Sequence, residues 1–415
     1  MQMRSLEVIE MRRVLMLCND RQIDRRIILQ ADSLQEAGWQ VTILAMPLDE
    51  AGAPDDSRVL RIGSASEAAV RRENRVLEFY RLVRRYLPMN GWFMRLLKSA
   101  AWRFVVDQER FYLNLFLATG RRHLAEVVVA HDLPMLAVGR ALAAEFGARL
   151  VYDSHELYCE QEFARWQRAT WAQIEQRHIS ACDRVITVNP SIAGELQRRY
   201  GLARVSVIHN AERIGPLPPR SNYLHEHFGI AAGQRILLFQ GGLSAGRHLG
   251  QLVQAMALLK SSDVHLVLLG DGQLAEALQR TVVRLRLQDR VHLHRAVPQA
   301  RLLSISSAAD AGIIPYQPIC LNNYYCTPNK LFEFIAAGLP ILASDLPELR
   351  RLVHDQQIGK VEDLSSVARL AAAIDDLFAD RPRLQAWRNT VEQVRQTQSW
   401  QCEGEKLKQI YEELR

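Results

Sequence analysis

Short apolar segments alternate with helical periods along this chain of 415 residues, and no other feature of the sequence limits its fold as strongly. The first repeat consists of "RVLMLCN" (13–19), a helix expected from about Asp24 to Ala37, a helix stop at Gly38, and "WQVTILAM" (39–46). Strands that are apolar along their whole length are typical of a parallel sheet with helices on both faces. The sequence therefore predicts an α/β fold.

The alternation forms two series separated by a polar stretch. The remaining strand-like segments of the first series are "AEVVVAHD" (125–132), "ARLVYDSHE" (148–156), "DRVITVN" (183–189) and "VSVIHN" (205–210). Those of the second series are "RILLFQGG" (235–242), "VHLVLLGDG" (264–272), "RVHLHRAV" (290–297), "AGIIPY" (311–316) and "PILASD" (340–345). Between them, residues 211–222 contain three prolines and one glycine and are expected to be a linker.

The length of the chain and the position of the linker predict the domain organisation. Because 415 residues exceed one ordinary core, we expect two Rossmann-like, doubly wound domains at 1–210 and 223–395. Open parallel sheets bind ligands at the carboxyl ends of their strands. The two domains are therefore expected to face a central cleft.

A helical, arginine-rich insertion at about 66–122 interrupts the first series. Aromatic and basic residues alternate between 71 and 116, among them Trp92, Trp102, Phe116, Arg81, Arg84 and Arg85. A basic amphipathic stretch of this kind can lie on an anionic membrane surface. In the alternative, the aromatic side chains pack on the domain and the arginines face water. We expect contact with a membrane or a lipid-linked substrate.

Composition and charge narrow the class of protein. The net charge of +6 is compatible with nucleic acid, an anionic membrane, phosphate-bearing ligands or ordinary surface charge, but no nucleic-acid module is recognisable. The six cysteines form no C-x-x-C pair, and neither a signal peptide nor an apolar run of about 18 residues is present. We expect a cytoplasmic protein, peripheral on the inner face of the cytoplasmic membrane if its basic insertion binds lipid.

Several common cofactor motifs are missing. The first strand is followed by "CNDRQIDRR", without the G-x-G-x-x-G of a dinucleotide site, and no G-x-x-x-x-G-K-[ST] occurs. No H-E-x-x-H or paired-cysteine site indicates a metal, and no D-x-D is available to hold a metal-bound nucleotide diphosphate. We expect neither a cofactor nor a metal.

Two motifs of the second series favour a phosphate ligand. In "FQGGLSAGRHLGQLV", Gly241 and Gly242 permit close backbone approach at a strand end, and Arg247 can bind a diphosphate near the next helix start. In "CTPNKLFEF", Asn329 and Lys330 stand at an expected helix N-terminus, where free amides and the helix dipole favour anions.

Glu333 lies about one turn further into the same expected helix. Its carboxylate could accept hydrogen bonds from ribose hydroxyls. The alternative is a surface glutamate, which the apolar neighbours of Glu333 disfavour. Together the two motifs predict a clamp for a nucleotide diphosphate.

The stretches "TPNKLFEFIAAGLPILASDLPEL", "FQGGLSAGRHLGQLVQAM" and "LVLLGDG" resemble the retaining glycosyltransferases of family GT4, which have the GT-B fold. The resemblance is looser in the first series, in "VVVAHDLPMLAVGRALA" and "LVYDSHELYCE". It implies a nucleotide-sugar donor in the second domain, an acceptor in the first, and a final helix at 396–415 that crosses back to the first domain.

The resemblance assigns site residues, with two departures. Thr327, Asn329, Lys330 and Glu333 match the family motif, with Glu333 as the ribose ligand. Tyr325 stands where the family has a first glutamate, which touches the donor sugar. The second departure is Gly242, which replaces an arginine, while Arg247 matches the family's lysine.

His155 and Asp132 are the candidate catalytic residues. His155 follows "LVYDS" and resembles the family's histidine near the donor sugar; alternatively it only caps or orients Asp153 or Glu156. Asp132 follows "VVVAH" and could orient the acceptor hydroxyl, with His131 as the alternative.

The expected function is transfer of a sugar, with retention, from a nucleotide-diphosphate sugar to a glycan or lipid-linked acceptor, in bacterial cell-surface polysaccharide synthesis. An epimerase of the same fold and a non-catalytic nucleotide-sugar-binding subunit are the alternatives.

Overall fold

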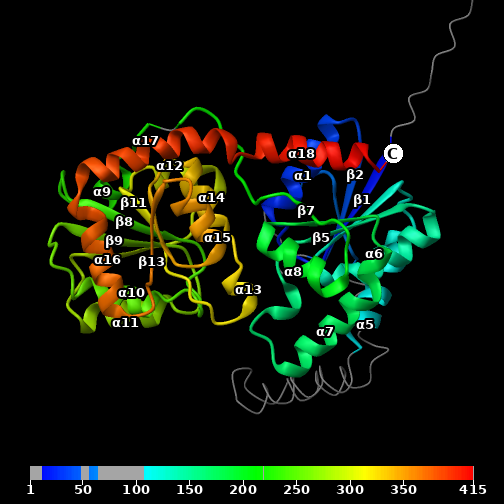
Figure 1. The fold of residues 1–415 in the computed structure, drawn as a ribbon, viewed down its shortest axis with the longest axis horizontal. Helices are drawn as coiled ribbons and strands as arrows, with labels where there is room; N and C mark the ends of the chain where they lie inside the picture. The colour runs from blue at the N-terminus through cyan, green and yellow to red at the C-terminus, as the bar shows by residue number, and fades with distance from the viewer. Residues whose placement is uncertain (1–11, 48–55, 64–106, 218, 415) are drawn as a thin grey trace, which may run out of the picture. The chain divides into compact units, whose positions relative to one another are not determined.

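The computed structural model describes residues 12–47, 56–63, 107–217 and 219–414 (Figure 1). The chain divides into two compact units: Met1–Ile208 with Gly404–Arg415, and His209–Glu403. Each unit is built on one parallel sheet, and Figure 1 shows helices on both sides of each sheet. The predicted α/β class, with two Rossmann-like domains, is confirmed.

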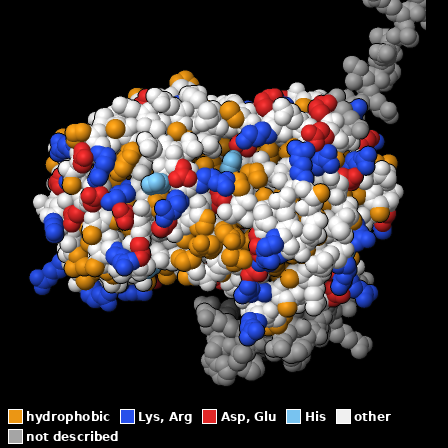
Figure 2. Space-filling view, in the orientation of Figure 1, with side chains coloured by type: hydrophobic (Ala, Val, Ile, Leu, Met, Phe, Trp, Pro, Cys, Tyr) orange, Lys and Arg blue, Asp and Glu red, His pale blue; other side chains and the backbone are white. Residues whose placement is uncertain are grey.

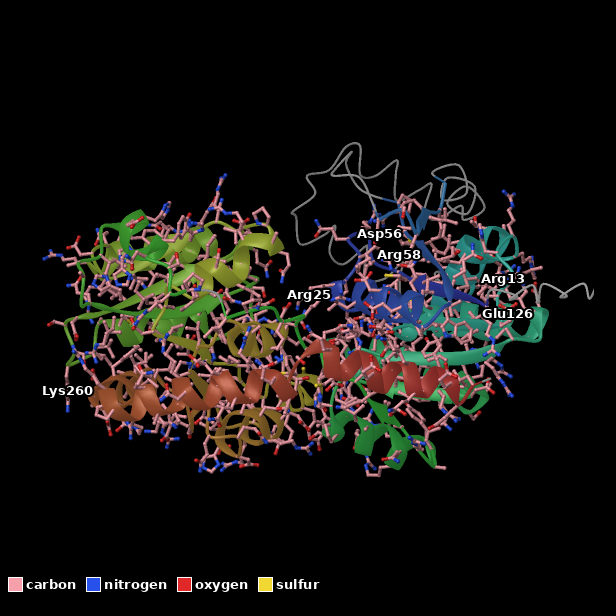
Figure 3. All side chains as sticks on the ribbon, turned by 90° about the horizontal axis from the view of Figure 1, so that it is seen from above. Arg13, Arg25, Asp56, Arg58, Glu126 and Lys260 are labelled. Atoms are coloured by element: carbon pink, nitrogen blue, oxygen red, sulfur yellow. The ribbon has the colours of Figure 1, made fainter. Side chains whose placement is uncertain are left out.

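The sheet of the first unit has seven strands in the order β3-β2-β1-β4-β5-β6-β7. They are β1 (Arg13–Cys18), β2 (Gln40–Ala45), β3 (Val59–Arg61), β4 (Val127–His131), β5 (Arg149–Ser154), β6 (Arg184–Thr187) and β7 (Ser206–Val207). An ion pair of 2.9 Å joins Arg13 to Glu126 at the starts of the central strands β1 and β4 (Figure 3). The strand order reverses between these two strands, where open α/β sheets place their ligands.

The sheet of the second unit has six strands in the order β10-β9-β8-β11-β12-β13. They are β8 (Arg235–Gln240), β9 (Val264–Leu269), β10 (Val291–His294), β11 (Ala311–Ile314), β12 (Ile341–Ser344) and β13 (Gly359–Glu362). The order reverses between β8 and β11, the second switch point.

Helices connect these strands. Those of the first unit are α1 (Arg25–Glu36), α5 (Gln108–Gly120), α6 (Leu133–Phe146), α7 (Arg165–His178) and α8 (Pro190–Tyr200). Those of the second unit are α9 (Tyr223–Phe228), α10 (Leu249–Met256), α11 (Ala275–Arg284), α12 (Gln299–Ser306), α13 (Leu321–Tyr324), α14 (Asn329–Ala336), α15 (Pro347–Leu349), α16 (Val367–Ala379) and α17 (Arg381–Thr397). The last helix, α18 (Trp400–Glu412), belongs to the first unit from Gly404 onward.

Local chemistry sets the bounds of these helices. Asp24 caps α1 by accepting a hydrogen bond from the amide of Arg26, and the predicted stop at Gly38 has a φ of 85°, which favours glycine. In the second unit, a Cβ on Gly312 of β11 would lie 2.4 Å from the ring of Phe334. The absence of a side chain at Gly312 therefore lets α14 pack directly on the sheet.

Most of the predicted basic insertion lies outside the described residues, which resume at 107. The helix α5 begins there, and its Phe116 is fully buried. Phe116 therefore packs in the core of the first unit, as in the alternative, and membrane contact by the segment stays a prediction. The rest of the segment up to residue 106 is not described.

Charge on the visible surface is mixed. Figure 2 shows Lys and Arg side chains interspersed with Asp and Glu over the described part of one face. No helix in the described ranges combines the length and apolar character needed to cross a membrane.

Candidate active site

Glycine turns follow the strands β8 and β9 at the carboxyl edge of the second sheet. Gly241 has a φ of 108°, and a Cβ on Gly270 would lie 2.0 Å from the carbonyl oxygen of Gly241. A Cβ on Gly272 would lie 2.3 Å from the carbonyl oxygen of Leu243. The two turns therefore pack backbone against backbone, and only glycine fits at these contacts.

Two cations meet at one tyrosine beside these turns. The guanidinium of Arg247 lies 4.2 Å from the ring centroid of Tyr316, and Nζ of Lys330 lies 4.7 Å from it. Lys330 also donates a hydrogen bond of 2.8 Å to the hydroxyl of Tyr316, and its Nζ lies 4.1 Å from the centroid of Phe239. A Cβ on Gly241 would lie 3.4 Å from the same nitrogen. The structure thus brings together Gly241, Arg247 and Lys330, and their role in donor binding stays a prediction.

Neither cation forms an ion pair with an acid among the described residues. Burial and the neighbouring Arg247 lower the pKa of Lys330 to about 7, and Glu333 offsets this only in part. A buried ammonium beside a second cation is held near its neutral form, and an anion bound at this point would restore its charge. The arrangement suits a ligand that brings negative charge.

Glu333 is fixed by hydrogen bonds that reach into the core. Its Oε2 accepts a hydrogen bond of 2.5 Å from Nε2 of Gln240, the last residue of β8. Oε1 of Gln240 in turn accepts a hydrogen bond of 2.7 Å from Ser306. The half-buried carboxylate is therefore oriented by the sheet, and the alternative of a mobile surface glutamate is disfavoured.

The remaining predicted donor residues lie around the start of α14. Asn329 is exposed, and its Oδ1 accepts a hydrogen bond of 3.1 Å from Asn210. Thr327 is buried and Tyr325 is half-buried at the end of α13, while Gly242 is exposed after β8. Pro328 occupies the N-cap position of α14, where no side chain caps the first amides of this helix.

The first unit has a different polar cluster at the carboxyl ends of β4 and β5. Asp153, fully buried, accepts two hydrogen bonds from Arg26, of 3.1 and 2.9 Å, and one of 2.6 Å from Gln30. Its Oδ2 also lies 3.3 Å from Nδ1 of His131 and 3.2 Å from Nε2 of His155. One carboxylate thus orients both histidines.

His155 joins this cluster to Asp132. The amide of His155 donates a hydrogen bond of 3.0 Å to Asp132, and its Nδ1 lies 3.4 Å from the other oxygen of that carboxylate. Asp132 precedes α6 with a φ of 62°, in the left-handed region that a non-glycine residue rarely adopts. The side chains of both residues are partly exposed, at 12% for His155 and 16% for Asp132.

The charges of this pair are coupled. Burial favours a neutral imidazole, but the carboxylates of Asp132 and Asp153 outweigh it and raise the pKa of His155 to about 9. Burial raises the pKa of Asp132 to about 7 against the pull of His155. Burial alone would raise the pKa of Asp153, yet Arg26 and His155 hold it well below its usual range. His155 is therefore a cationic hydrogen-bond donor near neutral pH.

His131, Asp153 and His155 also have the spacing of a metal site, with ligand atoms within 4.8 Å of one another. Oδ2 of Asp153, however, already accepts from Arg26 and Gln30. These hydrogen bonds occupy the lone pairs of this oxygen, which leaves it poorly placed to ligate a metal. These residues fit a hydrogen-bonded pair of histidines better than a metal, and the absence of a metal stays a prediction.

Sequence reasoning missed several members of the two sites. Tyr316 ends the quoted segment "AGIIPY", and Gly270 and Gly272 lie in "LLGDG", so each was visible as a strand end. Arg26 gave no such signal, because its partner Asp153 is 127 residues away in sequence.

Two family descriptions match the chain. "Glycosyl transferase 4-like domain" matches residues 23–211, and "Glycosyl transferases group 1" matches residues 234–380. The matched ranges together take in most of the chain, including the candidate residues of both units.

Individual relatives are distant in sequence but similar in fold. EpsD of Bacillus subtilis (strain 168) is 24% identical over 253 residues, so the match spans 57% of this chain and 62% of EpsD. Sucrose-phosphate synthase from Thermosynechococcus elongatus superposes with a TM-score of 0.74 at 18% identity, covering 97% of this chain and 99% of that chain. For HepE from Anabaena, in complex with UDP-glucose, the TM-score is 0.65 at 15% identity, with 97% and 99% covered.

Proposed function

This chain belongs to the group 1 glycosyl transferases, with a 4-like first domain, and we therefore propose that it transfers a sugar from a nucleotide-diphosphate sugar to an acceptor hydroxyl. The observation that carries the proposal is the pair of cations at Tyr316. Arg247 and Lys330 converge beside the glycine turn at Gly241, and neither is neutralised by an acid of the described chain. The complex of HepE with UDP-glucose supports a donor of this class.

Each donor residue has a distinct role in this proposal. The backbone of Gly241 and Gly242 permits a diphosphate to approach closely, and Arg247 and Lys330 bind its oxygens. The first amides of α14 add hydrogen-bond donors. Glu333, oriented by Gln240, accepts hydrogen bonds from the ribose.

The same cations also stabilise the leaving group during the reaction. When the bond between the sugar and the diphosphate breaks, negative charge develops on the leaving oxygen, and fixed cations stabilise it. Because the pKa of Lys330 is about 7 without an anion, the diphosphate itself induces full protonation of this residue. Two side-chain cations supply the charge that a divalent metal would otherwise supply, so we propose a metal-independent reaction.

The cluster of the first unit is proposed to serve the sugar and the acceptor. His155, cationic and partly exposed, is a hydrogen-bond donor for a sugar hydroxyl, and Asp132 orients the acceptor hydroxyl. No enzyme nucleophile is required if the acceptor attacks the sugar from the same face from which the leaving group departs. The product then keeps the configuration of the donor sugar.

Acceptor-dependent release of nucleoside diphosphate tests the proposal. A panel of nucleotide sugars is screened first by thermal shift, because a ligand at one hundred times its Kd stabilises by about 2.7 kcal/mol. Donors that bind are then incubated with glycan and lipid-linked acceptors, with and without EDTA, and the anomeric configuration of the product is determined by NMR. Transfer with retention that survives EDTA is the expected result.

Three other outcomes would each contradict part of the proposal. Conversion of the donor without an acceptor would indicate an epimerase. Donor binding with no turnover on any acceptor would favour a non-catalytic subunit. Activity lost with EDTA and restored by Mg²⁺ or Mn²⁺ would refute metal independence but leave the transferase intact.

A further inference from the structure

A cavity lies in the second unit, at the opposite edge of its sheet from the glycine turns. It has a volume of about 640 Å³, within the range of small-molecule sites. Arg235, the first residue of β8, and Asp310, which directly precedes β11, both line it. Because the strands are parallel, their amino ends form this edge, while Gly241 and Tyr316 lie past the carboxyl ends of the same two strands.

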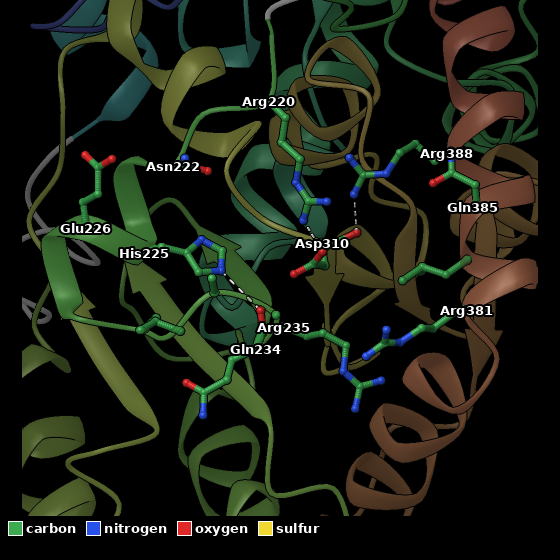
Figure 4. A pocket seen from close by; sticks show the side chains of 14 residues that line it. Arg220, Asn222, His225, Glu226, Gln234, Arg235, Asp310, Arg381, Gln385 and Arg388 are labelled. Carbon is green, nitrogen blue, oxygen red and sulfur yellow. Dashed lines mark hydrogen bonds and ion pairs between the residues drawn. The ribbon is translucent and has the colours of Figure 1, made fainter.

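Four arginines surround this cavity: Arg220, Arg235, Arg381 and Arg388. Figure 4 shows Arg220 and Arg388 extending toward Asp310 from different sides, and Glu226 pointing away from the arginines. Three acids act on these arginines: Asp310, Asp263, which pairs with Arg235 at 2.5 Å, and Glu392, whose charge acts on Arg388.

Two of the four arginines, Arg381 and Arg388, form no ion pair with an acid among the described residues. The carboxylate of Asp310 pairs with Arg220 and also accepts a hydrogen bond of 2.8 Å from the amide of Ile236. Arg388 donates only to backbone carbonyls, that of Asp310 at 3.0 Å and that of Ala309 at 3.4 Å. Carbonyl oxygens satisfy donors without cancelling the charge.

Arg381 has the fewest interactions of the four arginines. Among the described residues it forms neither a hydrogen bond nor an ion pair, although Asp263 lies within its electrostatic reach. It is exposed at the start of α17, so its side chain can turn toward a ligand without breaking a contact.

Two buried nitrogen atoms on the cavity lining also have no hydrogen-bond partner. They are Nε of Arg235, a donor, and Nδ1 of His225, which is an acceptor in the neutral ring because Nε2 donates to the carbonyl oxygen of Gln234 at 3.2 Å. Buried polar atoms without a partner are rare, because the lost hydrogen bond to water is costly. Burial and the neighbouring Arg220 also lower the pKa of Arg388, so the cavity disfavours further positive charge in its unliganded form.

We infer that this cavity is a binding site for a small phosphorylated molecule, separate from the donor site. A phosphate offers several oxygens to planar guanidinium groups, which bind it through paired hydrogen bonds. Arg381 and Arg388 supply guanidinium groups without an ion-pair partner among the described residues, and Arg220 and Arg235 supply two more on the same lining. The ligand occupies the amino edge of the sheet and does not compete with the nucleotide-sugar for Arg247 or Lys330.

Calorimetric titration with inorganic pyrophosphate tests this inference. The unmodified protein is expected to bind two equivalents, one at the cations of the donor site and one in the cavity. Arg381→Glu should weaken the cavity equivalent at least tenfold and leave the other unchanged. Lys330→Met should remove the donor-site equivalent and leave the cavity equivalent, so failure at one site is distinguishable from failure at the other.

Arg284→Glu is the matched control, because Arg284 is exposed on α11 and the substitution changes the net charge equally. It should change neither affinity by more than about twofold, the size expected of a long-range charge effect screened by salt. Arg220→Gln is a second cavity variant, and it should weaken the same equivalent as Arg381→Glu.

Two outcomes would overturn the inference. One is a single pyrophosphate equivalent in the unmodified protein that Arg381→Glu and Arg220→Gln leave intact. The other is dependence on Arg381 for binding to vesicles with anionic lipid but not for binding to soluble pyrophosphate, which would identify a lipid headgroup as the ligand.

Discussion

The polar clusters at the carboxyl edges of the two sheets differ in how their charges are balanced. In the first unit, the carboxylate of Asp153 is shared by Arg26, Gln30 and two histidines, so its charge is balanced within the chain. In the second unit, Arg247 and Lys330 share the ring of Tyr316 and have no acid as ion-pair partner among the described residues. The first cluster is organised without a ligand, and the second lacks an anion.

This difference separates two kinds of functional site. A self-compensated cluster keeps its side chains in place, and its substitution should affect the folded protein as well as the reaction. A cluster with uncompensated cations depends on its ligand for stability, so its substitution should mainly affect binding. Each prediction below tests one side of this contrast.

The largest effect is expected at Lys330. Lys330→Met removes the charge at nearly constant length, and the loss of a hydrogen bond to a charged group costs roughly 1.5–3 kcal/mol. Affinity for the nucleoside diphosphate should fall roughly tenfold to more than a hundredfold by calorimetry. The melting temperature without ligand should stay equal or rise, since a buried ammonium without an ion-pair partner is lost.

The control is Lys260→Met, on the surface of the same unit (Figure 3). It should leave affinity unchanged. If Lys330→Met bound the diphosphate as tightly as the unmodified protein, the proposal that Arg247 and Lys330 bind an anionic ligand would be wrong.

A smaller effect is expected at Glu333. Glu333→Ala should reduce affinity for a ribonucleoside diphosphate by roughly tenfold, because it removes the proposed acceptor for the ribose hydroxyls. The same variant should lose its preference for the ribonucleotide over the 2′,3′-dideoxy form, whereas Glu276→Ala, on exposed α11, should keep it. If Glu333→Ala kept the preference for the ribonucleotide, Glu333 would not be a ribose ligand, and its carboxylate would serve only to bind Gln240.

The contrast also shows what the sequence could predict. The donor motifs are contiguous, so the positions of Gly241, Arg247, Lys330 and Glu333 near strand and helix ends followed from local pattern alone. The edge strands β3 and β13 were not predicted, because "VLR" and "GKVE" are short and carry no continuous apolar run. A central strand buried on both faces is apolar throughout, whereas an edge strand need not be.

The partners of the catalytic candidates were less accessible to prediction. His155 and Asp132 were recognised at strand ends, but the network that sets their charge depends on Arg26, in a helix far along the chain. For His155, the sequence left open whether it lies near the donor sugar or only caps or orients Asp153 or Glu156. The structure shows that His155 is itself held by Asp153, so the two roles are not exclusive.

The smallest effect is expected on the stability of the first unit as a function of pH. The pKa of His155 is raised to about 9 in the folded protein, against an ordinary value near 6.5. Its contribution to stability is therefore complete below about pH 6.5 and is lost as the pH rises through about 9. The raised pKa of Asp132, about 7, acts in the same direction but at lower pH, so His155 dominates between pH 7 and 9.5.

Melting temperatures of the unmodified protein and of His155→Gln, recorded as a function of pH, measure the contribution of His155 to stability. Glutamine keeps a hydrogen-bonding side chain but cannot carry a proton, so the difference between the two proteins should be larger at pH 7 than at pH 9.5. A contribution of about 1 kcal/mol corresponds to roughly 2–4 °C for a unit of this size. This difference should shrink as the pH approaches 9.5, while groups common to both proteins cancel. If the melting temperatures of the two proteins changed in parallel across that interval, Asp132 and Asp153 would not hold His155 in its charged form. The charge of Asp153 would then be balanced by Arg26 alone.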